Sequence, residues 1–211
     1  MPVSVKQYSL YIFDLDGTLV DSSQAELRCY AATLGRLGYV YRESDLPQLP
    51  RQSFRATYEL YDPHGEKHTF REFVRTLLEE AGRFQSEAAV PFPDTARTVA
   101  ELVDDGFSLC VATRMTSIRA KRLLKQYDLL RFFDHVIGSD SVQHPKPDPE
   151  CIMKCLSYYS ISLEQAVMVG DTPNDMLAAQ RAGVTGILID RSGREEHVPC
   201  TARIRTLTEL L

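Results

Sequence analysis

From Asp94 onward, short apolar runs alternate with longer amphipathic stretches, and this alternation restricts the fold more than any other feature of the sequence. The expected strands are 107–112, 135–137, 166–169 and 185–189, and the expected helices are 94–105, 116–127, 149–158 and 173–182. Strands that alternate with helices form a parallel sheet with helices on both faces. The predicted class is therefore α/β, a doubly wound parallel sheet, and residues 201–211 are expected to add a short strand and a helical turn.

An apolar run near the N-terminus, Leu10–Phe13, is typical of a central strand that is buried on both faces. It ends directly in Asp14, Leu15, Asp16 and Gly17. Open α/β sheets bind their ligands at the carboxyl ends of their strands, so two carboxylates in this place suggest a site. Asp and Gly are also ordinary turn residues, and the motif alone divides between a site and a turn.

Between these two regions the sequence is helical. The predicted helices run from Ser23 to Gly38, from 53 to 61, and from 70 to a cap at Gly82, and Ser23 with Glu26 has the spacing of a capping box. The segment Pro91-Phe92-Pro93 closes this part of the chain. The sequence thus predicts an all-helical domain, residues 20–91, inserted into a core of residues 1–19 and 92–211.

Composition excludes several classes of protein. Apolar residues make up 44% and charged residues 25% of the 211 residues, which is ordinary for a globular chain. A net charge of −5 without a basic cluster disfavours nucleic acid, and no apolar run approaches the ~20 residues of a membrane helix. Residues 1–7 lack a signal-type apolar region, and the odd number of five cysteines suits a reducing compartment, so we expect a cytoplasmic protein. Cys151 and Cys155 could share a metal, but no further Cys or His pair completes a site, and core packing is expected.

Polar side chains follow four of the expected strands. They are Asp14 and Asp16 after the first, Thr113 after the second, Lys146 beyond the third, and Asp171 and Asp175 after the fourth. Four aspartates at one sheet edge repel one another unless a cation lies among them, and a set of oxygen ligands selects Mg²⁺. A lysine and a hydroxyl at the same edge suit a phosphate. Gly17 and Gly170 would allow the backbone to approach a ligand closely.

With these motifs the sequence resembles the haloacid dehalogenase-like hydrolases, and within them the phosphatase branch that carries a helical cap of the C1 type. Asp14-x-Asp16-Gly17-Thr18 resembles the first motif, Thr113 the second, Lys146 the third, and Gly170-Asp171-x-x-x-Asp175 the fourth. Asp21-Ser22, Lys146-Pro147-x-Pro149 and the length of the inserted domain are similar to the phosphoglycolate phosphatase-like group.

The resemblance implies a mechanism with Asp14, Asp16 and Lys146 as catalytic residues. Asp14 would attack phosphorus and form an aspartyl-phosphate, and Asp16 would protonate the leaving group and then activate water. Lys146 would neutralise both the nucleophile and the phosphate. Thr113 would bind a phosphate oxygen with the backbone N–H of Arg114, whose side chain either reaches the substrate or remains solvated.

The resemblance also implies Mg²⁺ bound by Asp14, Asp171 and the backbone carbonyl of Asp16, with Asp175 as a direct or water-mediated ligand. Asp175 equally suits the start of a helix behind Thr172 and Pro173. The cap would close over the site, and Arg51 and Arg55 are candidates for contacts with an anionic substrate.

The leading functional prediction is a Mg²⁺-dependent phosphatase for a small phosphorylated metabolite, as a monomer or homodimer without nucleic-acid or membrane partners. A sugar-phosphate mutase would use the same Asp14 and Asp16 but transfer the phosphoryl group to a sugar. A receiver-like signalling module or an inactive phosphate-binding protein is a rival of another class. The order of the motifs and the inserted domain argue against the receiver, and the complete set of catalytic groups argues against the inactive protein. A dehalogenase is disfavoured because Asp16 supplies an acid that halide departure does not need.

Overall fold

The computed structural model describes residues 8–191 and 198–211, so the expectation for residues 1–7 lies outside the described residues. The chain divides into two compact units, residues 1–21 with 91–211 (unit 1) and residues 22–90 (unit 2). The sequence predicted these boundaries at 19/20 and 91/92. Each unit has its own apolar core.

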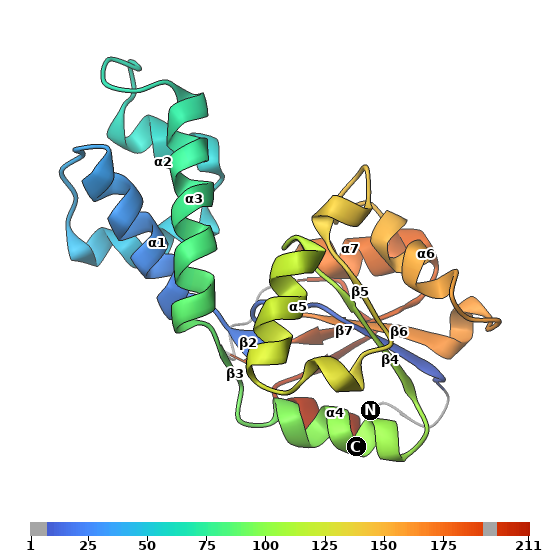
Figure 1. Cartoon of the computed structure of the whole chain (residues 1–211). Coiled ribbons are helices and arrows are strands. Elements are labelled where there is room, and N and C mark those ends of the chain that lie inside the picture. Colours follow the sequence, from blue (N-terminus) through green and yellow to red (C-terminus); the bar gives the residue numbers. More distant parts are fainter. Residues whose placement is uncertain (1–7, 192–197) are drawn as a thin grey trace. The chain divides into compact units, whose positions relative to one another are not determined.

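Unit 1 is built on a sheet of six strands in the order β5-β4-β1-β6-β7-β8 (Figure 1). All of its strand pairs are parallel. The strands are β1 (Leu10–Phe13), β4 (Ser108–Ala112), β5 (His135–Ile137), β6 (Ala166–Gly170), β7 (Thr185–Ile189) and β8 (Ala202–Ile204). The predicted α/β class with a parallel sheet is confirmed, and β1 is a central strand.

Helices cover both faces of this sheet. They are α4 (Thr95–Asp104), α5 (Ser117–Gln126), α6 (Glu150–Leu156) and α7 (Pro173–Ala182), with short 3₁₀ turns at 130–132, 139–141, 163–165 and 207–210. On one face Leu10 and Ile12 share a buried cluster with side chains of α6 and α7. On the other face, the Phe13 ring meets that of Phe133, and the Tyr11 ring meets that of Phe107. Because β1 is buried on both sides, its sequence is a continuous apolar run.

The register of β1 places its carboxyl end between two neighbours. Phe13 lies beside Val111 of β4 and beside Val169 of β6. The residues that follow these three strands therefore emerge at one edge of the sheet.

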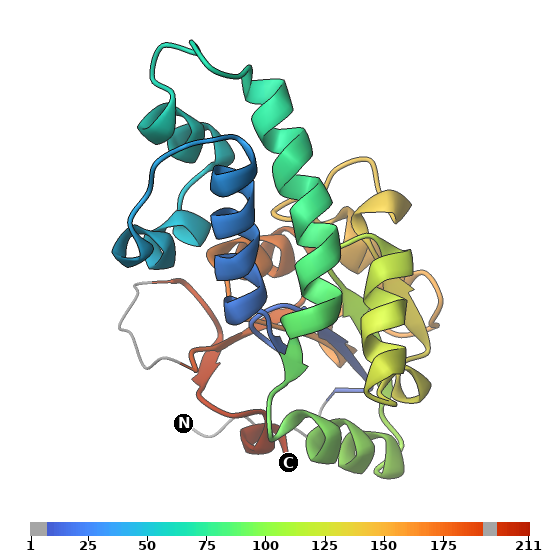
Figure 2. The same ribbon diagram turned by 60° about the vertical axis from the view of Figure 1, so that its left-hand side comes forward.

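Unit 2 consists of α1 (Ser23–Arg36), a 3₁₀ segment (Glu43–Arg51), α2 (Phe54–Tyr61) and α3 (Phe70–Ala88). Helices α1 and α3 pack along each other (Figure 2). Their buried faces join those of the shorter elements in one core, which includes Leu34, Leu49, Tyr58 and Phe73. None of the helices in the described residues is both long and apolar enough to span a membrane.

Three local predictions for this region are wrong. Helix α1 has Ser22 as its N-cap, so the expected capping box, with Ser23 at the cap position, does not start this helix. Helix α3 continues past Gly82 to Ala88, because Phe84 still packs against the core and tertiary packing outweighs the helix cost of glycine. Two short strands, β2 (Val20–Asp21) and β3 (Val90–Pro91), pair where no strand was expected.

Candidate active site at the carboxyl edge of the sheet

The buried lysine Lys146 lies between two aspartates that follow different strands. Its Nζ is 2.7 Å from Asp14 Oδ1 and 2.5 Å from Asp175 Oδ1, and it also donates to the Ala112 carbonyl oxygen at 2.8 Å. The three charged residues are 5%, 7% and 1% exposed, respectively. Side chains that are 29 to 161 positions apart thus meet in one buried ion-pair network.

Asp171 joins this network from the end of β6. Its Oδ1 accepts a hydrogen bond of 3.2 Å from the hydroxyl of Thr18. Gly17 has a positive φ of 79°, and a Cβ at Gly17 would overlap the Asp171 carboxylate. A Cβ at Gly170 would likewise overlap Asp175. The two glycines therefore make room for carboxylates of the protein itself.

Asp175 serves two purposes. Its Oδ2 accepts from the N–H and the hydroxyl of Thr172, and the Asp175 N–H donates to the Thr172 hydroxyl, which completes a capping box at the start of α7. Its Oδ1 faces Lys146. Asp175 therefore caps the start of α7 and also contacts Lys146, as both predictions for this residue expected. The capping box fixes the orientation of its carboxylate.

Burial and mutual repulsion disturb the protonation of these groups. Burial, and then the neighbouring carboxylates, raise the pKa of Asp14 well above its usual range although Lys146 lowers it. Burial and Asp175 raise the pKa of Asp171 to about 7. Burial alone would lower the pKa of Lys146, but the charges of Asp14 and Asp175 outweigh it and raise that pKa. Lys146 therefore keeps its positive charge, whereas Asp14 and Asp171 resist ionisation.

A divalent cation fits this arrangement. Carboxylate oxygens of Asp14, Asp171 and Asp175 lie within 4.8 Å of one another. All three ligands are oxygen, as Mg²⁺ prefers, and an added positive charge would allow the carboxylates to ionise together. Within the described residues only one other group has this spacing, His144, Asp148 and Glu150, and there Glu150 already accepts the N–H groups of Gln143 and His144. Cys151 and Cys155 belong to neither group and lie in the apolar core.

The hydroxyl of Thr113 lies at the adjacent strand end. Thr113 is 4% exposed, and its Oγ1 accepts from the Met115 N–H, so the hydroxyl proton is available for an acceptor. The next residue, Arg114, is exposed, and across the described part of the chain its guanidinium makes no hydrogen bond or ion pair with the acidic cluster.

Of the remaining predicted residues, Asp16 is half-buried on the same loop, where its backbone bridges to Val20. Its carboxylate is outside the group of three that could share an ion. In unit 2 the guanidinium of Arg55 lies 3.8 Å from the centre of the Phe70 ring, with Nε 4.0 Å from Glu59. The side chain of Arg51 lies outside the described residues.

Three residues that hydrogen bonds link in series to Asp171 were not among the predicted site residues. Thr18 was part of a motif but had no role, and Arg191 and Asp94 were not considered. Arg191 follows β7, so an inspection of the fifth strand end could have found it. Its guanidinium lies 3.0 Å from the Asp94 carboxylate, and no pattern in the sequence pairs the two residues, because the contact depends on side-chain geometry.

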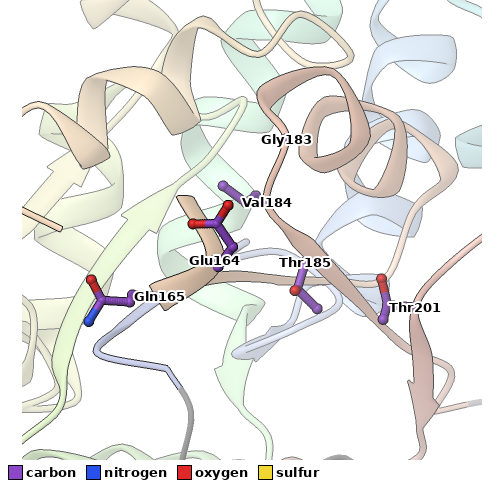
Figure 3. A pocket seen from close by; sticks show the side chains of 6 residues that line it. All are labelled: Glu164, Gln165, Gly183, Val184, Thr185 and Thr201. Atoms are coloured by element: carbon purple, nitrogen blue, oxygen red, sulfur yellow. The ribbon is translucent and has the colours of Figure 1, made fainter. Parts of the chain in front are cut away.

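A pocket elsewhere in unit 1 contains none of the residues of the acidic cluster in its lining (Figure 3). It is lined by Glu164, Gln165, Gly183, Val184, Thr185 and Thr201. Gln165 precedes β6 and Thr185 begins β7, so the pocket lies at the amino ends of these strands. The acidic cluster follows the opposite ends.

Comparisons of sequence and of structure find known proteins that resemble this chain. A sequence profile of the haloacid dehalogenase-like hydrolases matches residues 11–189. The chain is 32% identical over 199 residues to a phosphoglycolate phosphatase of Vibrio cholerae (85% of this chain, 83% of the relative). It is 30% identical over 181 residues to a pyrophosphatase of Bacillus velezensis (84% and 81%). A haloacid dehalogenase-like hydrolase structure from Streptococcus pneumoniae superposes with a TM-score of 0.81 at 22% identity and covers 97% of each chain.

Proposed function

Because the chain belongs to the haloacid dehalogenase-like hydrolases, we propose that it is a Mg²⁺-dependent phosphatase that cleaves small phosphomonoesters through a phosphorylated Asp14. One observation carries the proposal, the buried contact of Lys146 with Asp14 beside Asp171 and Asp175. Removing charged groups from water costs free energy, so a buried cluster of charges needs an explanation. Carboxylates with shifted pKa values at the ligand-binding edge of an α/β sheet are typical of catalytic sites.

Asp14 is the nucleophile in this proposal. Lys146 holds one of its oxygens at 2.7 Å, which restricts the rotation of the carboxylate and leaves the other oxygen to attack phosphorus. The charge of Lys146 also favours the ionised form of Asp14, which burial opposes. Hydrolysis of the resulting acyl phosphate regenerates the carboxylate.

Proton transfer falls to Asp16, two residues along the same loop. It protonates the leaving alkoxide in the first step and takes a proton from water in the second. Thr113 donates its hydroxyl proton to a phosphate oxygen, and Lys146 offsets the charge that the phosphate brings.

Mg²⁺ would be held by Asp14 and Asp171, with the Asp16 carbonyl and a water on Asp175 completing the set. When bound, it supplies positive charge between nucleophile and phosphate. Asp175 is the weakest candidate for direct ligation, because its two oxygens already face Lys146 and Thr172.

The names of the relatives support a proposal for the substrate class. Two curated relatives are named for phosphoglycolate and pyrophosphate hydrolysis, and both substrates are small and strongly anionic. We propose a small phosphorylated metabolite of the phosphoglycolate type as the substrate of this chain.

The test is phosphate release from an artificial aryl phosphate with Mg²⁺, with EDTA, and with Mg²⁺ added back. Activity that EDTA removes and Mg²⁺ restores is expected, and Asp14→Asn should lack it under all three conditions. Activity that persists in EDTA would contradict the metal, and activity of Asp14→Asn would contradict the nucleophile. Release of phosphate from phosphoglycolate, pyrophosphate, sugar phosphates and nucleotides then ranks substrates, and an isomerised sugar phosphate without free phosphate would indicate a mutase.

A further inference from the structure

Arg191, two residues after the end of β7, joins two segments that are far apart in the sequence. Its Nη1 and Nη2 donate to the two carboxylate oxygens of Asp94 at 3.0 and 3.1 Å, and Nη2 also donates to the Thr18 carbonyl oxygen at 2.7 Å. The guanidinium carbon lies 3.7 Å from the centre of the Phe92 ring. The side chains of Arg191 and Asp94 are 17% and 13% exposed, so this is a mostly buried, bidentate pair.

Residues 92–95 also hold the carbonyl group of Leu19, the residue after Thr18. The oxygen of Leu19 accepts from the Phe92 N–H at 3.1 Å and from the Thr95 hydroxyl at 2.7 Å. Asp94 is itself fixed by the Leu207 N–H at 2.7 Å. Two consecutive carbonyl groups, those of Thr18 and Leu19, are thus anchored to residues 92–95 and Arg191.

Anchoring this backbone matters for the acidic cluster, because the hydroxyl of Thr18 donates to Asp171. Thr18 is fully buried, and its backbone follows Gly17, whose positive φ gives the loop an unusual path. A β-branched side chain has few rotamers, so a fixed Thr18 backbone also fixes the direction of its hydroxyl.

We propose that Arg191 is a positioning residue: by holding the Thr18 carbonyl against Asp94, it keeps the Thr18 hydroxyl on Asp171 and so orients that carboxylate for the divalent cation. This inference rests on the proposed function, since it assigns a metal-binding role to Asp171. Groups that orient a metal ligand without touching the metal commonly change metal affinity by ~10–100-fold when they are removed.

A lysine at position 191 separates this role from simple packing. Arg191→Lys keeps the positive charge but loses the planar fork that reaches Asp94 and Thr18 together. Arg203→Lys is the matched control, because Arg203 pairs with Asp190 at 3.2 Å in the same part of unit 1 and the pair does not involve Thr18.

The experiment is calorimetric titration of metal-free, full-length protein with Mg²⁺, with kcat and KM for an aryl phosphate measured in parallel. We expect Mg²⁺ to bind Arg191→Lys about 10-fold more weakly and Arg203→Lys within about 2-fold of the unsubstituted protein. KM should stay constant, because Thr113 and Lys146 contact the phosphate, and kcat should recover at saturating Mg²⁺. In a Thr18→Val background, Arg191→Lys should cause no further loss of affinity.

Several results would overturn the inference. They are an unchanged Mg²⁺ affinity in folded Arg191→Lys, equal losses in Arg191→Lys and Arg203→Lys, or additive losses with Thr18→Val. Arg191→Met, which keeps an apolar stem against Phe92, is the second variant, and failure of both Arg191 variants to fold would show a purely structural role. If the unsubstituted protein binds Mg²⁺ and releases phosphate while Arg191→Lys behaves identically, only this inference fails. If the unsubstituted protein does neither, the proposed function fails first.

Discussion

Two buried aspartates, one in each unit, differ in how the protein compensates for removing a carboxylate from water. Asp14 in unit 1 is 7% exposed and Asp62 in unit 2 is 5% exposed. Asp62 accepts from the N–H groups of Glu66, Lys67 and His68 at 2.8 to 3.1 Å and from the Tyr39 hydroxyl at 2.9 Å. Asp14 faces one lysine and two further carboxylates.

The protonation of the two groups differs accordingly. The His68 N–H and the other donors outweigh burial and lower the pKa of Asp62 to about 2. Burial and the carboxylates Asp175 and Asp171 raise the pKa of Asp14 although Lys146 is adjacent. Unit 2 satisfies its buried charge with its own donors, whereas unit 1 leaves a demand for positive charge that an ion and a substrate site can use.

Of all the substitutions, Asp14→Asn should have the largest effect, and it should separate the role of Asp14 in activity from its effect on stability. Loss of the nucleophile should lower kcat for an aryl phosphate by about 10⁴-fold or more. Without metal, the same change removes a carboxylate whose burial is unfavourable, so Tm in EDTA should stay constant or rise. Enzyme assays and thermal unfolding check the two effects. Retention of more than about 1% of kcat, or a fall in Tm, would contradict the comparison.

Lys146→Met should have the next largest effect. It leaves Asp14 and Asp175 buried without their cation, which typically costs about 3–5 kcal/mol of unfolding free energy, and kcat should fall by about 10²–10³-fold. Lys67→Met is the control in unit 2, because Lys67 is exposed and its Nζ lies 5.5 Å from the centre of the Tyr39 ring. It should change unfolding free energy by about 0.5 kcal/mol or less. Equal effects of the two substitutions, measured by denaturant unfolding, would remove the distinction between the sites.

Asp62→Asn tests the other half of the comparison. The amide of asparagine has the shape of the carboxylate, but only one of its two polar atoms accepts hydrogen bonds. Some of the N–H and O–H groups that donate to Asp62 would therefore lose their acceptor, and Tm should fall by several degrees. Because the folded pKa is lower than the ordinary 3.8, Asp62 stabilises unit 2 fully above about pH 4 and loses this contribution as the pH falls toward about 2.

The stability difference between Asp62→Asn and the unsubstituted protein should therefore shrink as the pH falls from about 4 to about 2. Amide hydrogen-exchange protection of Glu66, Lys67 and His68 reports the same transition locally, since these N–H groups bond to the carboxylate. A stability difference that stays constant down to pH 2, or protection that persists, would show that Asp62 does not depend on its donors.

The fold was predictable from the sequence to a large extent, and the reason is physical. A buried parallel strand needs an apolar run and a covering helix needs an apolar stripe, so Leu10–Phe13 and the alternation after Asp94 specify the sheet. Ends of elements were less predictable. Gly82 indicates a helix end locally, but the packing of Phe84 extends α3 past it.

The candidate site was predictable only as a set of residue types at strand ends. Parallel strands bring Asp14, Lys146 and Asp171 to one edge, and that follows from topology. Topology does not predict that Asp175 both caps α7 and contacts Lys146, because these two contacts depend on the orientation of each carboxylate oxygen. The bidentate contact of Arg191 with Asp94 joins positions 97 apart in the sequence, and no periodicity indicates it.

The smallest expected effect concerns Arg55, a cation of unit 2 that the sequence suggested as a substrate contact. Its guanidinium stacks on Phe70 and approaches Glu59, and its side chain is 57% exposed. These contacts explain the position of the Arg55 side chain without a bound substrate. An exposed cation–π contact contributes only ~0.5–1 kcal/mol to the unfolding free energy. Arg55→Ala should therefore lower Tm slightly and leave kcat/KM for the best substrate of a phosphate-release screen unchanged. A loss of kcat/KM of about 10-fold or more, ~1.4 kcal/mol, with unchanged Tm would instead place Arg55 at the substrate and show that unit 2 also holds charge for a ligand.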